Sequence, residues 1–228
     1  MQTKNLIDGI KVLTPEESLR VSSEVHSLRH LWDDERYRLG AGISYYRPGA
    51  LYYATSKQMN PILRKHFGWM YDKLQDAIAT SYSVEVGFRD DLALPGFNIY
   101  CGPNDFSTIR YNIHVDLQFM ELNWEPEGSA DFSTTMSFTL PIASPVHGAG
   151  LNIWEVTQSD ISEQELEGTE LLSVQKAKYQ RYEVGIATVH DGRHYHQMAV
   201  AENWLPTDER ITLQGHGLMQ NGRLVIYG

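Results

Sequence analysis

Hydrophobic residues near the start of the chain recur at helical spacing behind a helix-start signal. Thr14 is followed by Pro15 and, three positions after Thr14, by Glu17, a capping box with proline at the first helical position. Behind this signal, apolar residues recur every three or four positions up to Trp32. The pattern predicts an amphipathic helix over roughly residues 14–32.

A second helical pattern begins at Asn60-Pro61. Its apolar face is formed by residues at helical spacing, namely Leu63, Phe67, Met70, Leu74 and Ile78. Between the two predicted helices, the Gly- and Tyr-rich segment 40–57 predicts one or two strands, with a turn at Arg47-Pro48-Gly49.

Beyond about Leu94 the pattern changes to short β-type segments separated by turn residues. Strands are expected near residues 96–101, 108–119, 134–142, 150–157, 183–190, 194–201, 209–216 and 222–227. The polar segment 159–180 predicts a surface loop with a helical turn. Eight short strands with no strong helix among them indicate a mainly β fold, as a sandwich, barrel or jelly roll. We expect a single domain, with a helical and mixed part over residues 1–93 and a β core over 94–228.

The clearest alternation of apolar and polar residues is "RYNIHVDLQF", residues 110–119. On a strand, His114 and Asp116 point the same way, with their Cβ atoms about 6.6 Å apart. Taken alone, such a pair is best explained as the solvated face of an edge strand. Its interpretation therefore depends on what accompanies it elsewhere in the chain.

Composition narrows the classes of partner and compartment. The net charge of -10, without any basic run, argues against nucleic acids and anionic membranes. Cys101 is the only cysteine, which favours a reducing compartment. The N-terminus lacks the apolar core of a signal peptide, and no apolar run approaches the roughly 18 residues that span a bilayer. We expect a soluble, cytoplasmic protein.

The chemistry-bearing residues follow a particular order along the chain. His114-x-Asp116 comes first, and the segment "HDGRHYH" (190–196) supplies a distant histidine. Arg210 follows His196 by fourteen residues, at the head of another alternating strand. This ordered combination is much rarer than any one of its parts, and it makes a metal site the preferred interpretation.

Roughly residues 96–217 resemble the iron(II)- and 2-oxoglutarate-dependent dioxygenases. His114-Val115-Asp116 matches the first two ligands of that family's HxD…H motif, and "GIATVHDGRHYH" resembles the run that ends in its distal histidine. "FNIYCGP" and "MSFTLPIASPVHGAGLNIWE" resemble the segments before and after the HxD strand. The resemblance implies a double-stranded β-helix (jelly roll), with the N-terminal helices packed against it.

Three histidines compete for the third ligand position. His190, His194 and His196 share parity, so one continuous strand would point all of them the same way. The family pattern places the ligand eleven residues after the glycine, which from Gly185 is His196. As candidates for the third ligand, His194 ranks second and His190 third. The sequence leaves open the roles of the two histidines that do not bind the metal.

The resemblance implies an iron(II) ion held by His114, Asp116 and His196. Two imidazoles and one carboxylate on one face of the metal leave three positions open. In the family, 2-oxoglutarate and O2 occupy these positions. Family members that halogenate lack the carboxylate, so Asp116 points to hydroxylation or desaturation.

The resemblance also implies a set of residues for 2-oxoglutarate. Arg210 suits the distal carboxylate of the cosubstrate, because a guanidinium forks onto a carboxylate with two parallel hydrogen bonds. Thr212 shares its strand face, and Tyr100 is a candidate hydroxyl donor. Without the upstream motif, a surface salt bridge from Arg210 to Asp208 or Glu209 would be the preferred explanation. Gln214 and His216 continue the same face, lining the pocket or closing the end of the barrel.

We therefore expect an iron(II)/2-oxoglutarate-dependent oxygenase that hydroxylates an unactivated C–H bond of a small molecule, an amino acid or natural-product intermediate, releasing succinate and CO2. The short chain favours a small substrate over a protein. Arg47, Arg110 and Arg193 are candidate substrate contacts, although ordinary surface arginine is the preferred explanation for each. The alternatives are a cupin-type metal enzyme without 2-oxoglutarate, a peptidyl or protein hydroxylase, and a non-catalytic jelly-roll binding module.

Overall fold

The computed structural model describes residues 5–43, 49–102, 105, 112–125, 128–163, 175–201 and 203–228. The helices are α1 (Pro15–Ser27), η1 (Arg29–Leu31), α3 (Ala50–Tyr82), η2 (Gln118–Glu121) and α5 (Gln158–Glu163). The strands are β1 (Asp8–Lys11), β2 (Arg38–Leu39), β3 (Glu85–Phe88), β4 (Gly96–Cys101), β5 (Ala130–Ala143), β6 (Gly150–Thr157), β7 (Lys178–Arg181), β8 (Ile186–His190), β9 (His194–Ala199), β10 (Glu209–Gln220) and β11 (Arg223–Tyr227). Within this part of the chain, no helix has the length and apolar character needed to cross a membrane.

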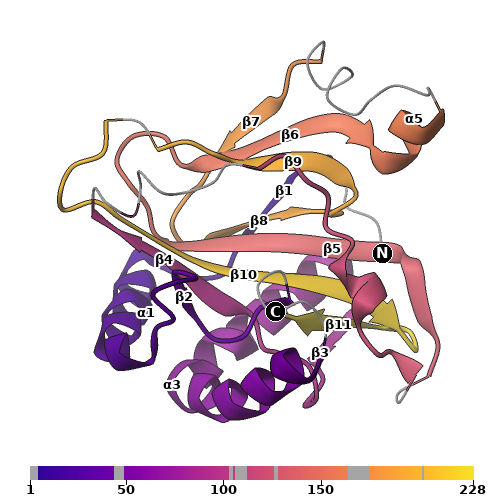
Figure 1. Cartoon of the computed structure of the whole chain (residues 1–228), viewed down its shortest axis with the longest axis horizontal. Coiled ribbons are helices and arrows are strands. Elements are labelled where there is room, and N and C mark those ends of the chain that lie inside the picture. The colour runs from indigo at the N-terminus through magenta and orange to yellow at the C-terminus, as the bar shows by residue number, and fades with distance from the viewer. Residues whose placement is uncertain are drawn as a thin grey trace.

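The strands form two sheets that lie one above the other (Figure 1). The large sheet has eight strands, with β1-β8-β5-β10-β11-β3 in order; β4 pairs with β10, and β2 pairs with β4. The small sheet has the order β7-β6-β9. Apart from the parallel pair β11·β3, the registered pairs are antiparallel. This arrangement confirms the mainly β prediction.

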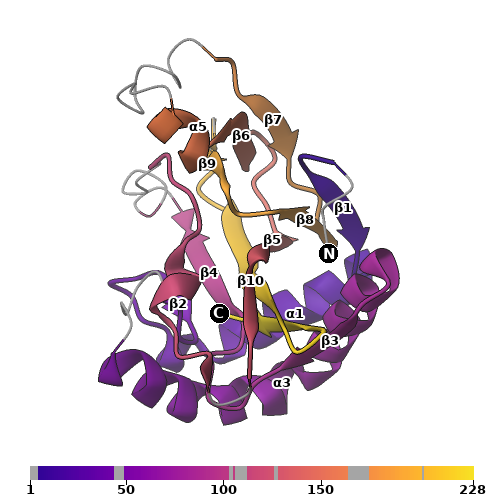
Figure 2. The same ribbon diagram turned by 90° about the vertical axis from the view of Figure 1, so that its right-hand side faces the viewer.

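Strand β10 is the centre of the large sheet. One of its edges pairs with β5, whereas the other pairs first with β4 and then with β11. Helices α1 and α3 cover the large sheet on the side away from the small sheet (Figure 2). A pocket lined by residues of both sheets, among them Arg210 on β10 and Met198 on β9, lies on one face of the large sheet. The core under the helices lies on the other face.

The core under the helices is built by the apolar face of α3. The five residues predicted for that face, Leu63, Phe67, Met70, Leu74 and Ile78, are all fully buried. The Phe67 ring lies 4.7 Å from the Phe97 ring on β4, measured between centroids. This contact fixes the position of β4, whose opposite face looks into the pocket.

The capping box predicted for the first helix is present. The hydroxyl oxygen of Thr14 accepts a hydrogen bond from the Glu17 N–H, and the Glu17 carboxylate accepts one from the Thr14 N–H. The helix ends at Ser27 and the short turn η1 follows, so the predicted span of 14–32 consists of two pieces.

The predicted start of the second helix at Asn60 is wrong, because α3 begins at Ala50 and continues through Pro61. Asn60 instead uses its side-chain amide outside the helix, bonding the backbone of Leu92 and Leu94. Upstream of the proline, Tyr52 is fully buried and its hydroxyl bonds the backbone of Ala93 and Gly228. These tertiary contacts hold the extra turns in the helical state. The segment predicted as strands is thus helical from residue 50, and residues 44–48 lie outside the described part.

The strand predicted over residues 108–119 is also wrong where the structure describes it. Residues 106–111 lie outside the described part, and 112–117 form no strand apart from a single bridge between His114 and His196. A 3-10 turn, η2, follows at once. Burial does not alternate as predicted either, because Ile113 is 41 % exposed whereas Asp116 is buried. The other seven predicted strands coincide with observed ones, while β1, β2, β3 and β7, each of four residues or fewer, were missed.

Candidate metal centre

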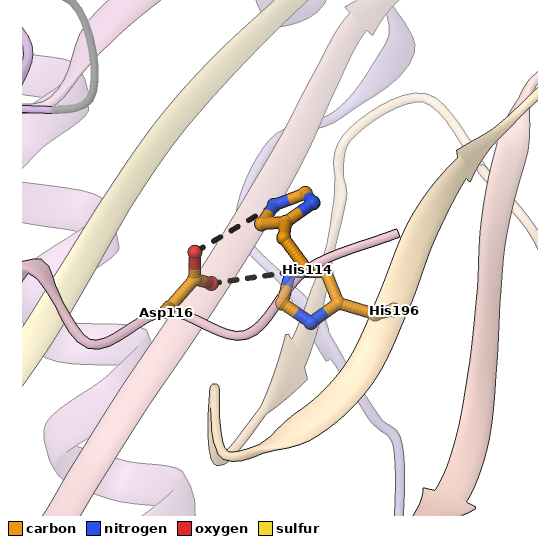
Figure 3. Close-up of side chains that lie close together, drawn as sticks. All are labelled: His114, Asp116 and His196. Carbon is orange, nitrogen blue, oxygen red and sulfur yellow. Dashed lines mark ion pairs between the residues drawn. The ribbon is translucent and has the colours of Figure 1, made fainter. Parts of the chain in front are cut away.

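His114, Asp116 and His196 converge between the two sheets (Figure 3). One ligand atom from each lies within 4.8 Å of the others, and they form the one such metal-capable group in the described part of the chain. Asp116 Oδ2 lies 3.3 Å from His196 Nε2, and Asp116 Oδ1 lies 3.8 Å from His114 Nε2. Asp116 and His196 are buried, whereas His114 is exposed.

Backbone hydrogen bonds bring these three residues together. His114 and His196 exchange two N–H···O bonds of 2.9 Å, and the Asp116 N–H donates to the Gly192 carbonyl at 2.7 Å. Gly192 has a φ of +75°, and a Cβ there would lie 2.7 Å from Ser137 Oγ and 3.2 Å from Asp116 Cβ. The turn that carries Gly192 therefore needs glycine both for its conformation and for space.

The backbone also sets which ring nitrogens face the centre. His114 Nδ1 lies 2.9 Å from the Asn112 carbonyl and His196 Nδ1 lies 2.9 Å from the His194 carbonyl. A carbonyl only accepts, so each Nδ1 carries a proton and each neutral ring presents a lone pair at Nε2. Two lone pairs and a carboxylate facing one another fit a divalent transition metal, which the histidine–histidine–carboxylate set is suited to bind.

Burial and charge act in opposite directions on this group. Burial alone raises the pKa of Asp116, but the surrounding histidines His196, His216 and His114 hold that pKa well below its usual range. Burial lowers the pKa of His196, yet the neighbouring Asp116 carboxylate raises it above the ordinary value overall. Asp116 is thus an anion that attracts positive charge to this point.

The other two candidate histidines lie differently. His194 directs Nδ1 to the Asp191 carboxylate, 3.0 Å from both oxygens. The buried His190 ring packs edge-on against His196, with centroids 4.4 Å apart, and its Nδ1 accepts the Gly192 N–H. Burial lowers the pKa of His190 to about 3. Of the three histidines, His196 is the one that points a ring nitrogen at Asp116.

A pocket opens beside the triad, and the space in it, together with the open solvent at its mouth, amounts to about 500 Å³. Arg210 projects into it from β10 and is 3 % exposed. Its Nε and Nη1 are buried and have no hydrogen-bond partner among the described residues. The salt bridges considered from the sequence do not form with this guanidinium: the Asp208 carboxylate accepts the Leu205 N–H, and Glu209 pairs with His26.

Thr212 and Tyr100 line the same pocket as Arg210. Tyr100 lies opposite Arg210 in the β4·β10 register, and its ring packs on Tyr37 with centroids 5.2 Å apart. The Arg210 guanidinium lies over the ring of Tyr182, 5.3 Å from its centroid. Tyr182 thus contacts the guanidinium, while Nε and Nη1 of Arg210 have no acceptor among the described residues.

Comparisons with known proteins bear on the fold. No family model and no curated protein matches this sequence. Among solved structures, an N-substituted L-amino acid dioxygenase from Burkholderia ambifaria AMMD matches with a TM-score of 0.54 at 12 % identity, over 97 % of this chain and 86 % of that one. The chain has this dioxygenase fold. The structure of such a dioxygenase from that organism with α-ketoglutarate (2-oxoglutarate) matches with a TM-score of 0.52 at 13 % identity, over 97 % and 86 % of the two chains.

AviO1 from Streptomyces viridochromogenes Tue57 matches with a TM-score of 0.54 at 11 % identity, over 95 % of this chain and 90 % of that one. The dioxygenase fold agrees with the double-stranded β-helix and packed helices expected from the sequence.

On the dioxygenase fold, the pocket includes residues that sequence reasoning missed. Ser137 and Thr139 on β5, Asn98 on β4 and Tyr182 line it beside the predicted residues. The signal was available on β5, where "TTMSFTL" alternates polar and apolar side chains. Ser137 and Thr139, two polar positions of that alternation, face the pocket and not bulk solvent.

The arginines suggested for substrate are not all placed. Arg47 and Arg110 lie outside the described residues. Arg193 donates from Nε to the Thr135 hydroxyl and from Nη2 to the Phe132 carbonyl. These bonds tie Arg193 to β5.

Proposed function

We propose that this protein is an iron(II)- and 2-oxoglutarate-dependent oxygenase that hydroxylates an unactivated C–H bond of a small molecule, with release of succinate and CO2. The observation that carries the proposal is one pocket holding both the His114/Asp116/His196 group and the buried Arg210 guanidinium, whose Nε and Nη1 have no hydrogen-bond partner among the described residues. Leaving buried N–H groups of a cation without an acceptor costs free energy. A ligand with a carboxylate for Arg210 and a chelating end for the metal satisfies both features.

In this proposal each residue has a defined task. Nε2 of His114, Nε2 of His196 and the Asp116 carboxylate bind the metal on one face. Arg210 holds the distal carboxylate of 2-oxoglutarate through its two free N–H groups, and Thr212 and Tyr100 orient it. The bound iron supplies oxygen activation coupled to decarboxylation of the cosubstrate.

One observation supports a small substrate. A structural neighbour is named as a dioxygenase of N-substituted L-amino acids. We infer an amino acid or natural-product intermediate as substrate, and a single domain over residues 1–228.

The alternatives meet specific difficulties. A cupin-type enzyme without 2-oxoglutarate gives no reason for a buried Arg210 whose Nε and Nη1 have no hydrogen-bond partner among the described residues. A binding module for sugar or peptide gives no reason for two histidine lone pairs turned toward a buried carboxylate.

The decisive experiment is an anaerobic titration of the metal-free protein with iron(II) and 2-oxoglutarate, followed by visible spectroscopy. We expect the charge-transfer band of the iron–2-oxoglutarate chelate in the wild type and in His194→Ala, but not in His196→Ala. His194→Ala is the matched control, because it removes a neighbouring imidazole that is bonded to Asp191.

Bound metal without the band in the wild type would favour the cupin-type alternative. A protein that binds no metal would favour the binding module. A band lost in His194→Ala and kept in His196→Ala would reverse the assignment of the third ligand.

A further inference from the structure

Asp116 is attached to a chain of hydrogen bonds that crosses the large sheet. The Ser137 hydroxyl on β5 donates to Asp116 Oδ2 at 2.6 Å. His216 on β10 places its Nδ1 3.1 Å from the same hydroxyl oxygen. All three side chains are buried, at 6 % exposure or less.

The positions of the protons follow from the partners. Ser137 has a single hydroxyl hydrogen, and an ionised carboxylate can only accept, so that hydrogen lies on the bond to Asp116. His216 Nδ1 must then donate to Ser137 Oγ. The bonds therefore run in one direction, from His216 to Ser137 to Asp116.

The two oxygens of Asp116 have different neighbours. Oδ2 accepts the short bond from Ser137 and lies 3.3 Å from His196 Nε2, whereas Oδ1 accepts a 3.4 Å bond from Gln118 and lies 3.8 Å from His114 Nε2. The bond from Ser137 therefore fixes the rotation of a carboxylate that faces both histidine nitrogens.

We propose that His216 and Ser137 are positioning residues that fix the Asp116 carboxylate in the orientation from which it would bind the metal. The proposal rests on the metal site proposed above. The His216 ring packs on the ring of Tyr227, with centroids 5.5 Å apart, and glycine at position 192 leaves space for the Ser137 hydroxyl, which a Cβ there would approach to 2.7 Å. Hydrogen-bonded partners of metal-binding carboxylates commonly contribute 10–100-fold to metal affinity.

The test is the affinity of the metal-free, full-length protein for Mn(II), measured from the free Mn(II) signal in electron paramagnetic resonance. We expect Ser137→Ala and His216→Leu each to weaken binding by about 10–100-fold. His216→Asn keeps an N–H donor near the Nδ1 position and is expected to stay within about twofold of the wild type. The double variant of Ser137→Ala with His216→Leu is expected to bind no more weakly than Ser137→Ala alone, because His216 acts through Ser137.

The matched control is Ser56→Ala, which removes a buried serine hydroxyl bonded to the Tyr52 carbonyl within α3. It is expected to leave the dissociation constant of Mn(II) unchanged, so that a loss in Ser137→Ala is not a general effect of removing a buried hydroxyl.

The outcomes separate the two proposals. Equal Mn(II) affinity in the wild type, Ser137→Ala and His216→Leu would overturn the positioning role while leaving the metal site intact. His216→Asn binding as weakly as His216→Leu would also overturn it, and this pair decides the question even if Ser137→Ala does not fold. A wild type that binds no Mn(II) would overturn the proposed function and the positioning role together.

Discussion

At the scale of single residues, the centre is governed by which atoms carry protons. Backbone carbonyls accept hydrogen bonds from Nδ1 of His114 and of His196. The Nε2 lone pairs of the two neutral rings are therefore directed at Asp116. Arg210 presents the opposite case, with two buried N–H groups and no acceptor among the described residues. The end of the pocket at Asp116 is therefore suited to a cation, and the end at Arg210 is suited to an anion.

Arg210→Lys should weaken the binding of 2-oxoglutarate by about 100-fold. Lysine keeps the charge but loses the parallel pair of charge-assisted hydrogen bonds, which are worth about 1.5–3 kcal/mol each, and about 1.4 kcal/mol corresponds to tenfold. The measurement is the 2-oxoglutarate dependence of the anaerobic charge-transfer band at saturating iron(II).

Arg64→Lys, on α3 behind the large sheet, serves as the control and should leave the curve unchanged. Mn(II) affinity should also be unaffected by Arg210→Lys. Wild-type affinity for 2-oxoglutarate in Arg210→Lys would remove the guanidinium from the cosubstrate site.

At the scale of elements, the alternation of polar and apolar residues along β10 does not separate a solvent face from a core face, because both faces are buried. Arg210, Thr212 and His216 are buried on one face, and Ile211 and Leu213 are buried on the other. The apolar face belongs to the core under the helices, whereas Arg210 and Thr212 on the polar face line the pocket. Polar alternation in this sheet therefore marks the site, whereas on an ordinary edge strand it marks solvent.

The start of α1 should show a pH-dependent contribution from Glu17. This carboxylate bonds Lys73 on α3 and the Thr14 N–H, and both bonds lower the pKa of Glu17 below its ordinary value of 4.5. A lowered folded-state pKa gives stability that is present above 4.5 and is lost as the pH falls through the lowered value. Glu17→Gln should therefore lower the melting temperature near neutral pH, and the difference should shrink in acid.

Circular-dichroism melts of wild type and variant at neutral pH and at about pH 3 check this. The exposed Glu35→Gln is the comparison, and it should leave the melting temperature unchanged at both pH values. A difference that grows in acid would contradict the assigned role of the carboxylate.

At the scale of the whole molecule, the large sheet separates two environments. One of its faces packs on α1 and α3 (Figure 2). Residues of its other face line the pocket together with residues of the small sheet. Changes in the helical core should therefore affect stability more than they affect the chemistry of the site.

Phe67→Ala tests this separation. Removing a fully buried phenylalanine that contacts Phe97 should lower the free energy of unfolding by about 3–5 kcal/mol. Mn(II) affinity of the protein that stays folded should match the wild type. Urea denaturation and metal titration are the two measurements, and a large loss of affinity at full folding would show that the core and the site are coupled.

The sequence by itself determined the features that depend on neighbours along the chain. The capping box of Thr14 and Glu17, the alternation of β5 and β10, and the order of His114, Asp116, His196 and Arg210 can all be read from spacing. These local signals, with the family resemblance, were sufficient for the fold class and for the candidate residues.

Tertiary structure decided what depends on contacts between distant segments. Over the described residues 112–117 the predicted strand does not form, since the Asp116 N–H bonds the Gly192 carbonyl. The tertiary structure also extends α3 on the N-terminal side of Pro61, since the Tyr52 hydroxyl bonds the Gly228 carbonyl. The bond between Ser137 and His216 joins residues 79 positions apart, and spacing carries no information about such a pair. Periodicity reports which face a side chain occupies, and only packing decides what lies across from it.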